Sequence, residues 1–147
     1  TPHAINWYSA SPDGRKVALG VSAGGSEDAS MRVLDVATGR QLGPIIERTL
    51  WGGISWSVDS RQIYFHRIQA LKKGAPPTEK YQRSMACVMP AGGSERSIRV
   101  LLRAGDKSPI DIPATEFPFI EVLPDGRAIA QVQDGVSPEF SAWHSTE

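Results

Sequence analysis

The stretch Ser11-Pro12-Asp13-Gly14-Arg15 decides the fold of this chain, because its pattern returns at Leu123-Pro124-Asp125-Gly126-Arg127. Proline sets φ at about −65°, aspartate bonds backbone groups ahead of it, and glycine accepts a positive φ, so each stretch predicts a hairpin turn. Ser57-Val58-Asp59-Ser60-Arg61 is a degenerate third copy, with valine and serine in place of proline and glycine. We expect structural roles for the turn residues Asp13, Gly14, Asp59, Asp125 and Gly126.

Short runs of β-branched or alternating apolar residues lie between these and other turn signals. The 14 glycines and 11 prolines fall at short intervals and leave few segments that could hold an amphipathic helix. The sequence therefore predicts an all-β fold. The expected strands are Lys16–Val21, Met31–Asp35, Gly53–Trp56, Gln62–His66, Met85–Met89, Ile98–Leu102, Phe119–Leu123 and Ala128–Val132.

The spacing of the turns predicts repeated units of antiparallel strands. The interval from Asp13 to Asp59 is close to the ~40–50 residues of a four-stranded propeller blade, and the next interval is longer by about 20 residues. We expect a partial β-propeller of about three four-stranded blades, at 5–47, 50–103 and 119–147, with an insertion loop at 69–80. Four blades of ~40 residues need about 160 residues, so residues 1–147 are expected to form an incomplete propeller domain.

Period-2 alternation predicts which side chains enter the core. We expect Val17, Leu19, Val33, Trp56, Ile63, Phe65 and Ile129 to be largely buried. The four tryptophans could form a ligand-stacking surface, but aromatic residues in propeller strands usually fill the space between blades. Core packing is therefore expected for Trp7, Trp51, Trp56 and Trp143.

One order of segments is more specific than a general propeller pattern. Residues 8–22 with their Pro-Asp-Gly turn, then Gly24-Gly25-Ser26-Glu27, then 31–39 resemble the early propeller blades of the prolyl oligopeptidase family of serine peptidases. The likeness continues through Gly53-Ile54-Ser55-Trp56 and Tyr64-Phe65 and is looser afterwards.

This resemblance implies a two-part enzyme without a cofactor. In such a protein an α/β-hydrolase catalytic domain holds a Ser-Asp-His triad, and the propeller covers it and admits short, proline-containing peptides. The chain resembles part of that cover, with the catalytic domain elsewhere in the parent. The alternative is a TolB-like or WD40-like interaction scaffold without an enzymatic parent, because both classes use the same turns.

Two glycine-serine segments superficially suggest a hydrolase nucleophile, which requires Gly-x-Ser-x-Gly on a strand-to-helix turn. Gly24-Gly25-Ser26-Glu27 and Gly92-Gly93-Ser94-Glu95 lack the closing glycine, so we expect loops there and no catalytic residue. The three histidines, His3, His66 and His144, are not spaced for metal ligation, so no metal site is expected.

Composition limits the partners further. The chain has 16 Lys and Arg against 16 Asp and Glu, which gives no reason to expect nucleic acid or an anionic membrane. No run of ~18–20 apolar residues is present. We expect a soluble protein, cytoplasmic or periplasmic, that begins at Thr1 as an excised or processed piece. Open blade faces predict self-association, and Cys87 is expected to be a buried, inert thiol.

Overall fold

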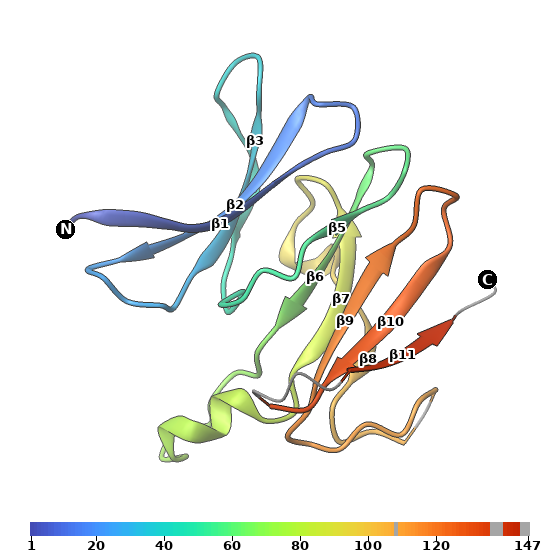
Figure 1. Cartoon of the computed structure of the whole chain (residues 1–147). Coiled ribbons are helices and arrows are strands. Elements are labelled where there is room, and N and C mark those ends of the chain that lie inside the picture. Colours follow the sequence, from blue (N-terminus) through green and yellow to red (C-terminus); the bar gives the residue numbers. More distant parts are fainter. Residues whose placement is uncertain (108, 136–139, 145–147) are drawn as a thin grey trace.

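The computed structural model describes residues 1–107, 109–135 and 140–144, the last of these as backbone only (Figure 1). The first sheet has the order β1-β2-β3-β4, the second has the order β5-β6-β7-β8, and the third has the order β11-β10-β9. All recorded pairings are antiparallel. The strands are β1 His3–Ala10, β2 Lys16–Ala23, β3 Ser30–Asp35, β4 Gln41–Ile46, β5 Ser55–Trp56, β6 Gln62–Arg67, β7 Met85–Pro90, β8 Arg99–Arg103, β9 Phe117–Val122, β10 Ala128–Gln133 and β11 Phe140–His144.

The predicted all-β, antiparallel fold is confirmed. Within the described ranges the helical segments are two short 3-10 helices, η1 (Pro77–Tyr81) and η2 (Glu95–Ser97). η1 ends the polar connection that leaves β6 and returns to β7. The third sheet shows three strands in the described part of the chain, one fewer than the other two. Strands β1, β4 and β11 were not among the strands expected from the sequence.

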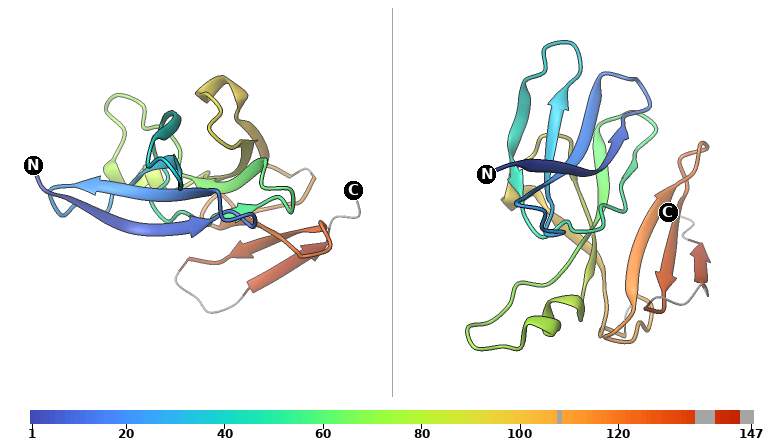
Figure 2. Two further views of the ribbon diagram at one scale, coloured as in Figure 1. Left: turned by 90° about the horizontal axis from the view of Figure 1, so that it is seen from above. Right: turned by 60° about the vertical axis from the view of Figure 1, so that its left-hand side comes forward.

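The three sheets follow one another face against face (Figure 2). The core between the first and second sheets includes Met31 and Ile46 on one side and Ile63, Phe65 and Met89 on the other. A smaller apolar cluster joins the second sheet to the third through Ala86, Leu102, Ala104, Ile112, Ala130 and Val132. A separate apolar cluster therefore packs between each pair of consecutive sheets.

The expected core is correct for Val33, Trp56, Ile63 and Phe65, which are buried. It is wrong for Val17, Leu19 and Ile129, which are only half-buried. In β2 the alternate positions Ala18, Gly20 and Ser22 face the core, and in β10 Ala130 and Val132 do so. The Trp7 ring explains the choice in β2, because it packs so closely on Gly20 that a Cβ atom there would lie 2.2 Å from the ring. Small residues therefore fill the inner face of this strand.

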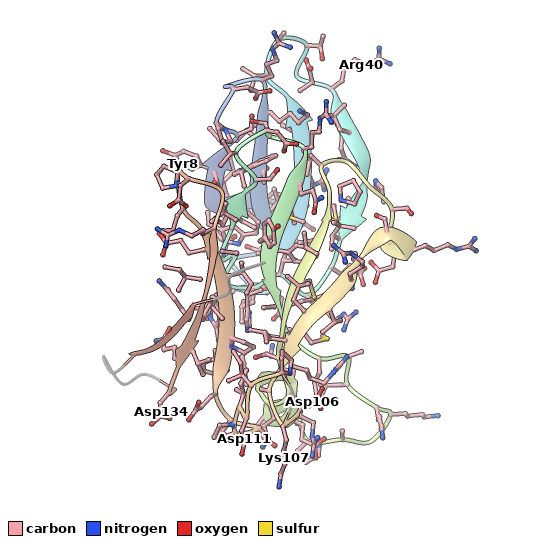
Figure 3. The ribbon with its side chains drawn as sticks, turned by 90° about the vertical axis from the view of Figure 1, so that its right-hand side faces the viewer. Tyr8, Arg40, Asp106, Lys107, Asp111 and Asp134 are labelled. Carbon is pink, nitrogen blue, oxygen red and sulfur yellow. The ribbon has the colours of Figure 1, made fainter. Side chains whose placement is uncertain are left out.

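The opposite face of the first sheet carries several apolar side chains beside Arg32 and Gln41, and it has no sheet against it in the described part of the chain. Tyr8 is 77% exposed and Ile5 64% exposed. Tyr8 is paired across the strands with Leu19. Figure 3 places the Tyr8 side chain at the periphery of the molecule, far from the end that carries Asp106 and Asp111. Val17 and Leu19 are half-buried because they belong to this uncovered face.

Candidate functional site

The two Ser-x-Asp turns at Ser11 and Ser57 have the same internal hydrogen bonds. The Ser11 hydroxyl donates to Asp13 Oδ1 over 2.6 Å, and the Arg15 N–H donates to the same oxygen over 3.0 Å. The Ser57 hydroxyl and the Arg61 N–H repeat this arrangement at Asp59. These hydrogen bonds, that of the serine first, lower the pKa of both carboxyl groups. Each aspartate carboxylate therefore stabilises the turn to which it belongs by accepting hydrogen bonds within it.

The third turn uses different chemistry, since Leu123 stands where the other two have serine. The Arg127 N–H donates to Asp125 Oδ1 over 3.0 Å, and the Arg127 guanidinium contacts Asp125 Oδ2 over 2.7 Å. The backbone hydrogen bond, and then the guanidinium, lowers the pKa of Asp125. The three turns lie at the same end of the molecule (Figure 1).

The degenerate turn is also the one that joins two sheets. Ser60 has a φ of 60°, in the region that Gly14 occupies at 68° in the first turn. Its hydroxyl accepts a hydrogen bond of 3.1 Å from the Asp13 N–H, and its carbonyl accepts one of 3.3 Å from Lys16 Nζ. A serine in a left-handed conformation is strained, and here its side chain makes a contact that glycine cannot make.

The sequence contains one Gly-x-Ser-x-Gly pentapeptide, Gly20-Val21-Ser22-Ala23-Gly24, which the motif analysis overlooked. The segment runs through β2 and reaches no helix. Ser22 is 2% exposed, and its hydroxyl donates to Asn6 Oδ1 over 2.7 Å. A hydrolase nucleophile needs an exposed hydroxyl on a tight strand-to-helix turn, so this serine does not have the geometry of a nucleophile.

His3 and His66 lie on strands of different sheets. His3 is exposed on β1, His66 is buried on β6, and the His144 side chain lies outside the described residues. Within residues 1–107 and 109–135, no group of three or more His, Cys, Asp and Glu side chains is arranged to hold a metal ion. Cys87 is buried, as expected, and burial raises the pKa of its thiol to about 11, which keeps the thiol protonated near neutral pH.

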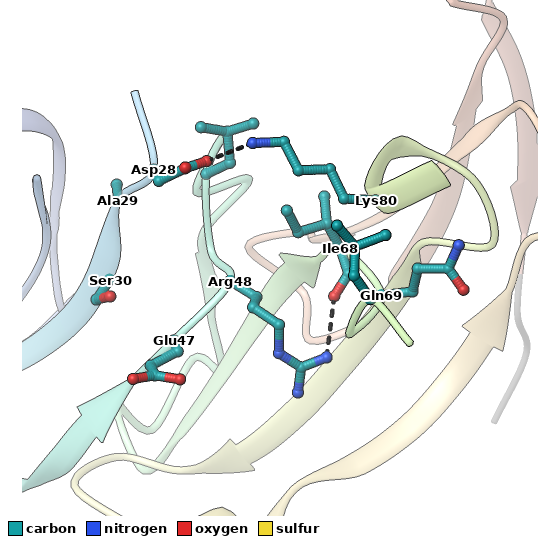
Figure 4. A pocket seen from close by; sticks show the side chains of 10 residues that line it. Asp28, Ala29, Ser30, Glu47, Arg48, Ile68, Gln69 and Lys80 are labelled. Atoms are coloured by element: carbon teal, nitrogen blue, oxygen red, sulfur yellow. Dashed lines mark hydrogen bonds and ion pairs between the residues drawn. The ribbon is translucent and has the colours of Figure 1, made fainter. Parts of the chain in front are cut away.

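A cavity of about 300 Å³, lined by both charged and apolar side chains, lies between the first two sheets and the β6–η1 connection (Figure 4). Lys80 Nζ closes one side by pairing with Asp28 over 2.8 Å, and Arg48 Nη1 donates to the Ile68 carbonyl over 3.2 Å. Burial, and then the neighbouring Arg67, lowers the pKa of Arg48. Asp28, Arg48 and Lys80 are thus bound to other groups of the chain, and Glu47 is the charged lining side chain for which no hydrogen bond or ion pair is recorded among the described residues.

A larger cavity, of about 500 Å³, opens between the second and third sheets; we call it the aromatic pocket. Trp51 stacks on Tyr81 with ring centroids 5.8 Å apart, and the Phe117 ring meets Trp51 edge-on at 4.7 Å. Trp51 is 40% exposed, so the expectation that it packs in the core is wrong. The lining residues are Trp51, Tyr81, Phe117, Phe119, Gln133 and Gly135.

Local backbone geometry positions these rings. Gly52 and Gly53 both have positive φ, at 65° and 56°, and a Cβ atom on Gly53 would lie 2.5 Å from Phe119 Cδ1. The Gly52 carbonyl accepts a hydrogen bond of 3.0 Å from the His66 N–H. Gly53 thus leaves room for Phe119, whose ring centroid lies 4.7 Å from that of His66. The Trp51 ring centroid lies 5.3 Å from that of His66.

The His66 ring packs behind the pocket against Trp51 and Phe119, and it carries no charge. Its side chain is fully buried, and neither ring nitrogen has a hydrogen-bond partner among the described residues. Burial lowers the pKa of His66 to about 3, so its ring is neutral at physiological pH. The sequence analysis treated His66 as an isolated residue, since its aromatic neighbours come from segments up to about 50 positions away.

Residues 2–98 match the family model described as the N-terminal β-propeller domain of prolyl oligopeptidase. Among solved structures, apo prolyl oligopeptidase B from Galerina marginata has a TM-score of 0.76 at 17% identity, with 97% of this chain and 20% of that chain covered. A structure from an analysis of two prolyl endopeptidases has a TM-score of 0.75 at 19% identity, with 95% and 18% covered. At these identities the similarity shows the fold. The chain spans about a fifth of the length of both structures.

Two further findings complete these comparisons. No curated protein matches the chain. In the part of the chain that the structure describes, no helix has the length and apolar character needed to cross a membrane.

Proposed function

The chain belongs to the prolyl oligopeptidase family, whose N-terminal β-propeller domain it matches, and from this membership we propose that it is the non-catalytic, access-restricting part of a serine peptidase that cleaves short proline-containing peptides. The observation that carries the proposal is the family match over residues 2–98. The fold agrees with it, since the antiparallel sheets superimpose on solved prolyl oligopeptidases along almost the whole chain.

The proposed partner is an α/β-hydrolase catalytic domain of the same parent chain. The only Gly-x-Ser-x-Gly segment in the sequence lies within a strand, with a buried serine. Acyl transfer needs a nucleophile, a base and an oxyanion hole in one geometry. The hydrolytic step is therefore assigned to the part of the parent that lies outside residues 1–147.

We infer that the segments 5–47, 50–103 and 119–147 correspond to three consecutive blades. The uncovered face of the first sheet carries Ile5, Tyr8, Val17 and Leu19. In a complete propeller the face of each blade packs against its neighbour, so this face is suited to another blade. When the chain is studied alone, the same face favours self-association.

The experiment compares substrates of different length with the intact parent protein. The proposal predicts rapid cleavage of a blocked Gly-Pro pentapeptide and at least about tenfold slower cleavage of the same sequence within an unfolded polypeptide of about 100 residues. Deleting residues 1–147 should remove this preference or abolish folding. An intact parent that cleaves both substrates equally fast contradicts the access-restricting role, and one that cleaves neither favours the scaffold alternative.

A further inference from the structure

The aromatic pocket differs from the core on either side of it because it is open. Its volume of about 500 Å³ falls within the range of ~300–1,000 Å³ typical of small-ligand sites. Trp51 exposes 40% of its surface. Tyr81, Phe117 and Phe119 are each half-buried. Four aromatic side chains thus meet around a space that they do not fill.

Among the residues that the structure describes, none of the side chains that line the pocket is acidic. Within the described part of the chain, the cation recorded near its rings is Lys80, whose Nζ lies 5.1 Å from the Tyr81 ring centroid. Aromatic sites for cationic ligands use ring faces to attract positive charge, and here a lysine of the chain already occupies one face. His66, beside the pocket, is neutral. The electrostatics therefore favour a neutral ligand.

One polar side chain accompanies the rings. Gln133, the last residue of β10, donates from Nε2 to the Gly135 carbonyl over 3.1 Å. Its amide oxygen has no recorded hydrogen bond within the described residues, and it remains able to accept one from a ligand N–H. The pocket thus offers flat apolar walls and one amide, which suits a ring attached to a peptide backbone.

The location keeps the pocket clear of blade packing. Its residues come from the connection before β5, from η1, from the start of β9 and from the end of β10. These elements lie at the ends of the sheets, and η1 and the start of β9 share the lower end in Figure 1. A neighbouring blade would cover sheet faces, whereas this pocket opens at a strand-end surface.

We propose that the aromatic pocket binds a proline-containing segment of an extended peptide, with the prolyl ring packed against Trp51 and Tyr81 and the backbone held by Gln133. A prolyl ring is neutral, compact and apolar, and proline-rich segments are conformationally restricted before they bind. This inference rests on the proposed function and adds a second, non-catalytic contact site for the peptide.

The experiment follows the tryptophan indole N–H signals of the chain by NMR while a blocked Gly-Pro-Gly-Pro tetrapeptide is added. The Trp51 signal, assigned by its loss in Trp51→Phe, should shift and saturate. The signals of Trp7 and Trp56 should shift much less, because neither residue lines the pocket and both indole N–H groups donate within the chain, to the Thr49 carbonyl and to Ser9 Oγ. Gly-Ala-Gly-Ala is titrated as a peptide without proline, and tetramethylammonium is titrated as a cationic ligand.

Variants refine the result. Trp51→Ala should weaken binding of the proline peptide about tenfold, the value of one aromatic contact. Tyr8→Ala removes an exposed aromatic residue from the first sheet and should leave the affinity unchanged. The variants are compared only when their thermal unfolding matches that of the original chain, and the titration of the unaltered chain is decisive without them.

Three results would overturn the inference: no saturable shift at Trp51, equal shifts with the alanine peptide, or a response only to tetramethylammonium, which would make the pocket a cation site. None of these affects cleavage of short peptides by the intact parent. Conversely, a parent without peptidase activity would remove the proposed function, even if the proline peptide binds this pocket.

Discussion

The junction between the first and second sheets has the larger apolar core and the smaller cavity, and we call it the closed junction. The junction between the second and third sheets has the smaller core and the larger cavity, and we call it the open junction. The closed junction has a continuous apolar core with Met31, Phe65 and Met89, and hydrogen bonds from Trp56 to Ser9 and from Asp13 to Ser60 fasten its rim. The open junction has a smaller core, and aromatic rings around His66 border a cavity of about 500 Å³.

The difference shows that consecutive sheets of one chain need not be joined in the same way. At the closed junction side chains of mixed size, among them Met31, Phe65 and Met89, fill the space between the sheets and contribute to stability. At the open junction four aromatic side chains line a cavity of about 500 Å³, which is large enough for a small ligand. Although the turn motif repeats along the chain, the closed junction therefore has a structural role and the open junction is a candidate binding site.

Truncating one phenylalanine at each junction should give the largest contrast. Phe65 is buried in the closed junction, and Phe65→Ala should lower the free energy of unfolding by about 3–5 kcal/mol. Phe119 is half-buried beside the aromatic pocket, and Phe119→Ala should cost about 1–2 kcal/mol. Urea unfolding measures both values, and equal losses would contradict the distinction between the junctions.

The open junction should also respond to pH through His66. Its pKa is lowered from 6.5 to about 3 in the folded chain, so the unfolded chain binds more protons between these values. Stability is therefore complete above pH ~7 and falls as the pH drops through 6.5 toward 3, by roughly 2 kcal/mol at pH 5.

His66→Phe is the matched control for this pH effect. It keeps a ring against Phe119 and removes the titrating group together with the two unpartnered nitrogens. Unfolding curves at pH 7 and pH 5 should show a smaller loss in the variant than in the original chain. Identical losses in the two proteins would show that His66 is not held neutral.

Substitutions of Ser60, at the rim of the closed junction, should have the smallest effect on stability. Ser60→Ala removes the acceptor of the Asp13 N–H while keeping a Cβ atom at positive φ, and should cost about 1 kcal/mol. Ser60→Gly loses the same hydrogen bond but relieves the left-handed strain, so it should cost less than alanine. Thermal unfolding that ranks glycine below alanine would refute this account of the degenerate turn.

The sequence predicted the turns well, because Pro-Asp-Gly acts within a few residues. It did not predict the link from Ser60 to Asp13, which depends on how two sheets pack. Alternation identified strand β2 but assigned Val17 and Leu19 to the core, since a period of two does not say which face is covered. Trp7 on Gly20 settles that choice in the folded chain.

The aromatic pocket was beyond sequence reasoning for a similar reason. Trp51, Tyr81 and Phe117 belong to separate connections and strands, and only the stacking of the second and third sheets brings them together. A local signal does exist in the Trp51-Gly52-Gly53 segment, because two glycines before a strand permit a close approach of other rings.

The central claim, that this propeller part belongs to a serine peptidase whose chemistry lies elsewhere in the parent, is tested most directly by labelling. The intact parent is treated with an active-site serine phosphonate, digested, and mapped by mass spectrometry. We predict one labelled serine, outside residues 1–147, and no label on Ser22. Stoichiometric labelling of a serine within residues 1–147, or a parent that takes up no label above a heat-denatured control, would contradict the claim.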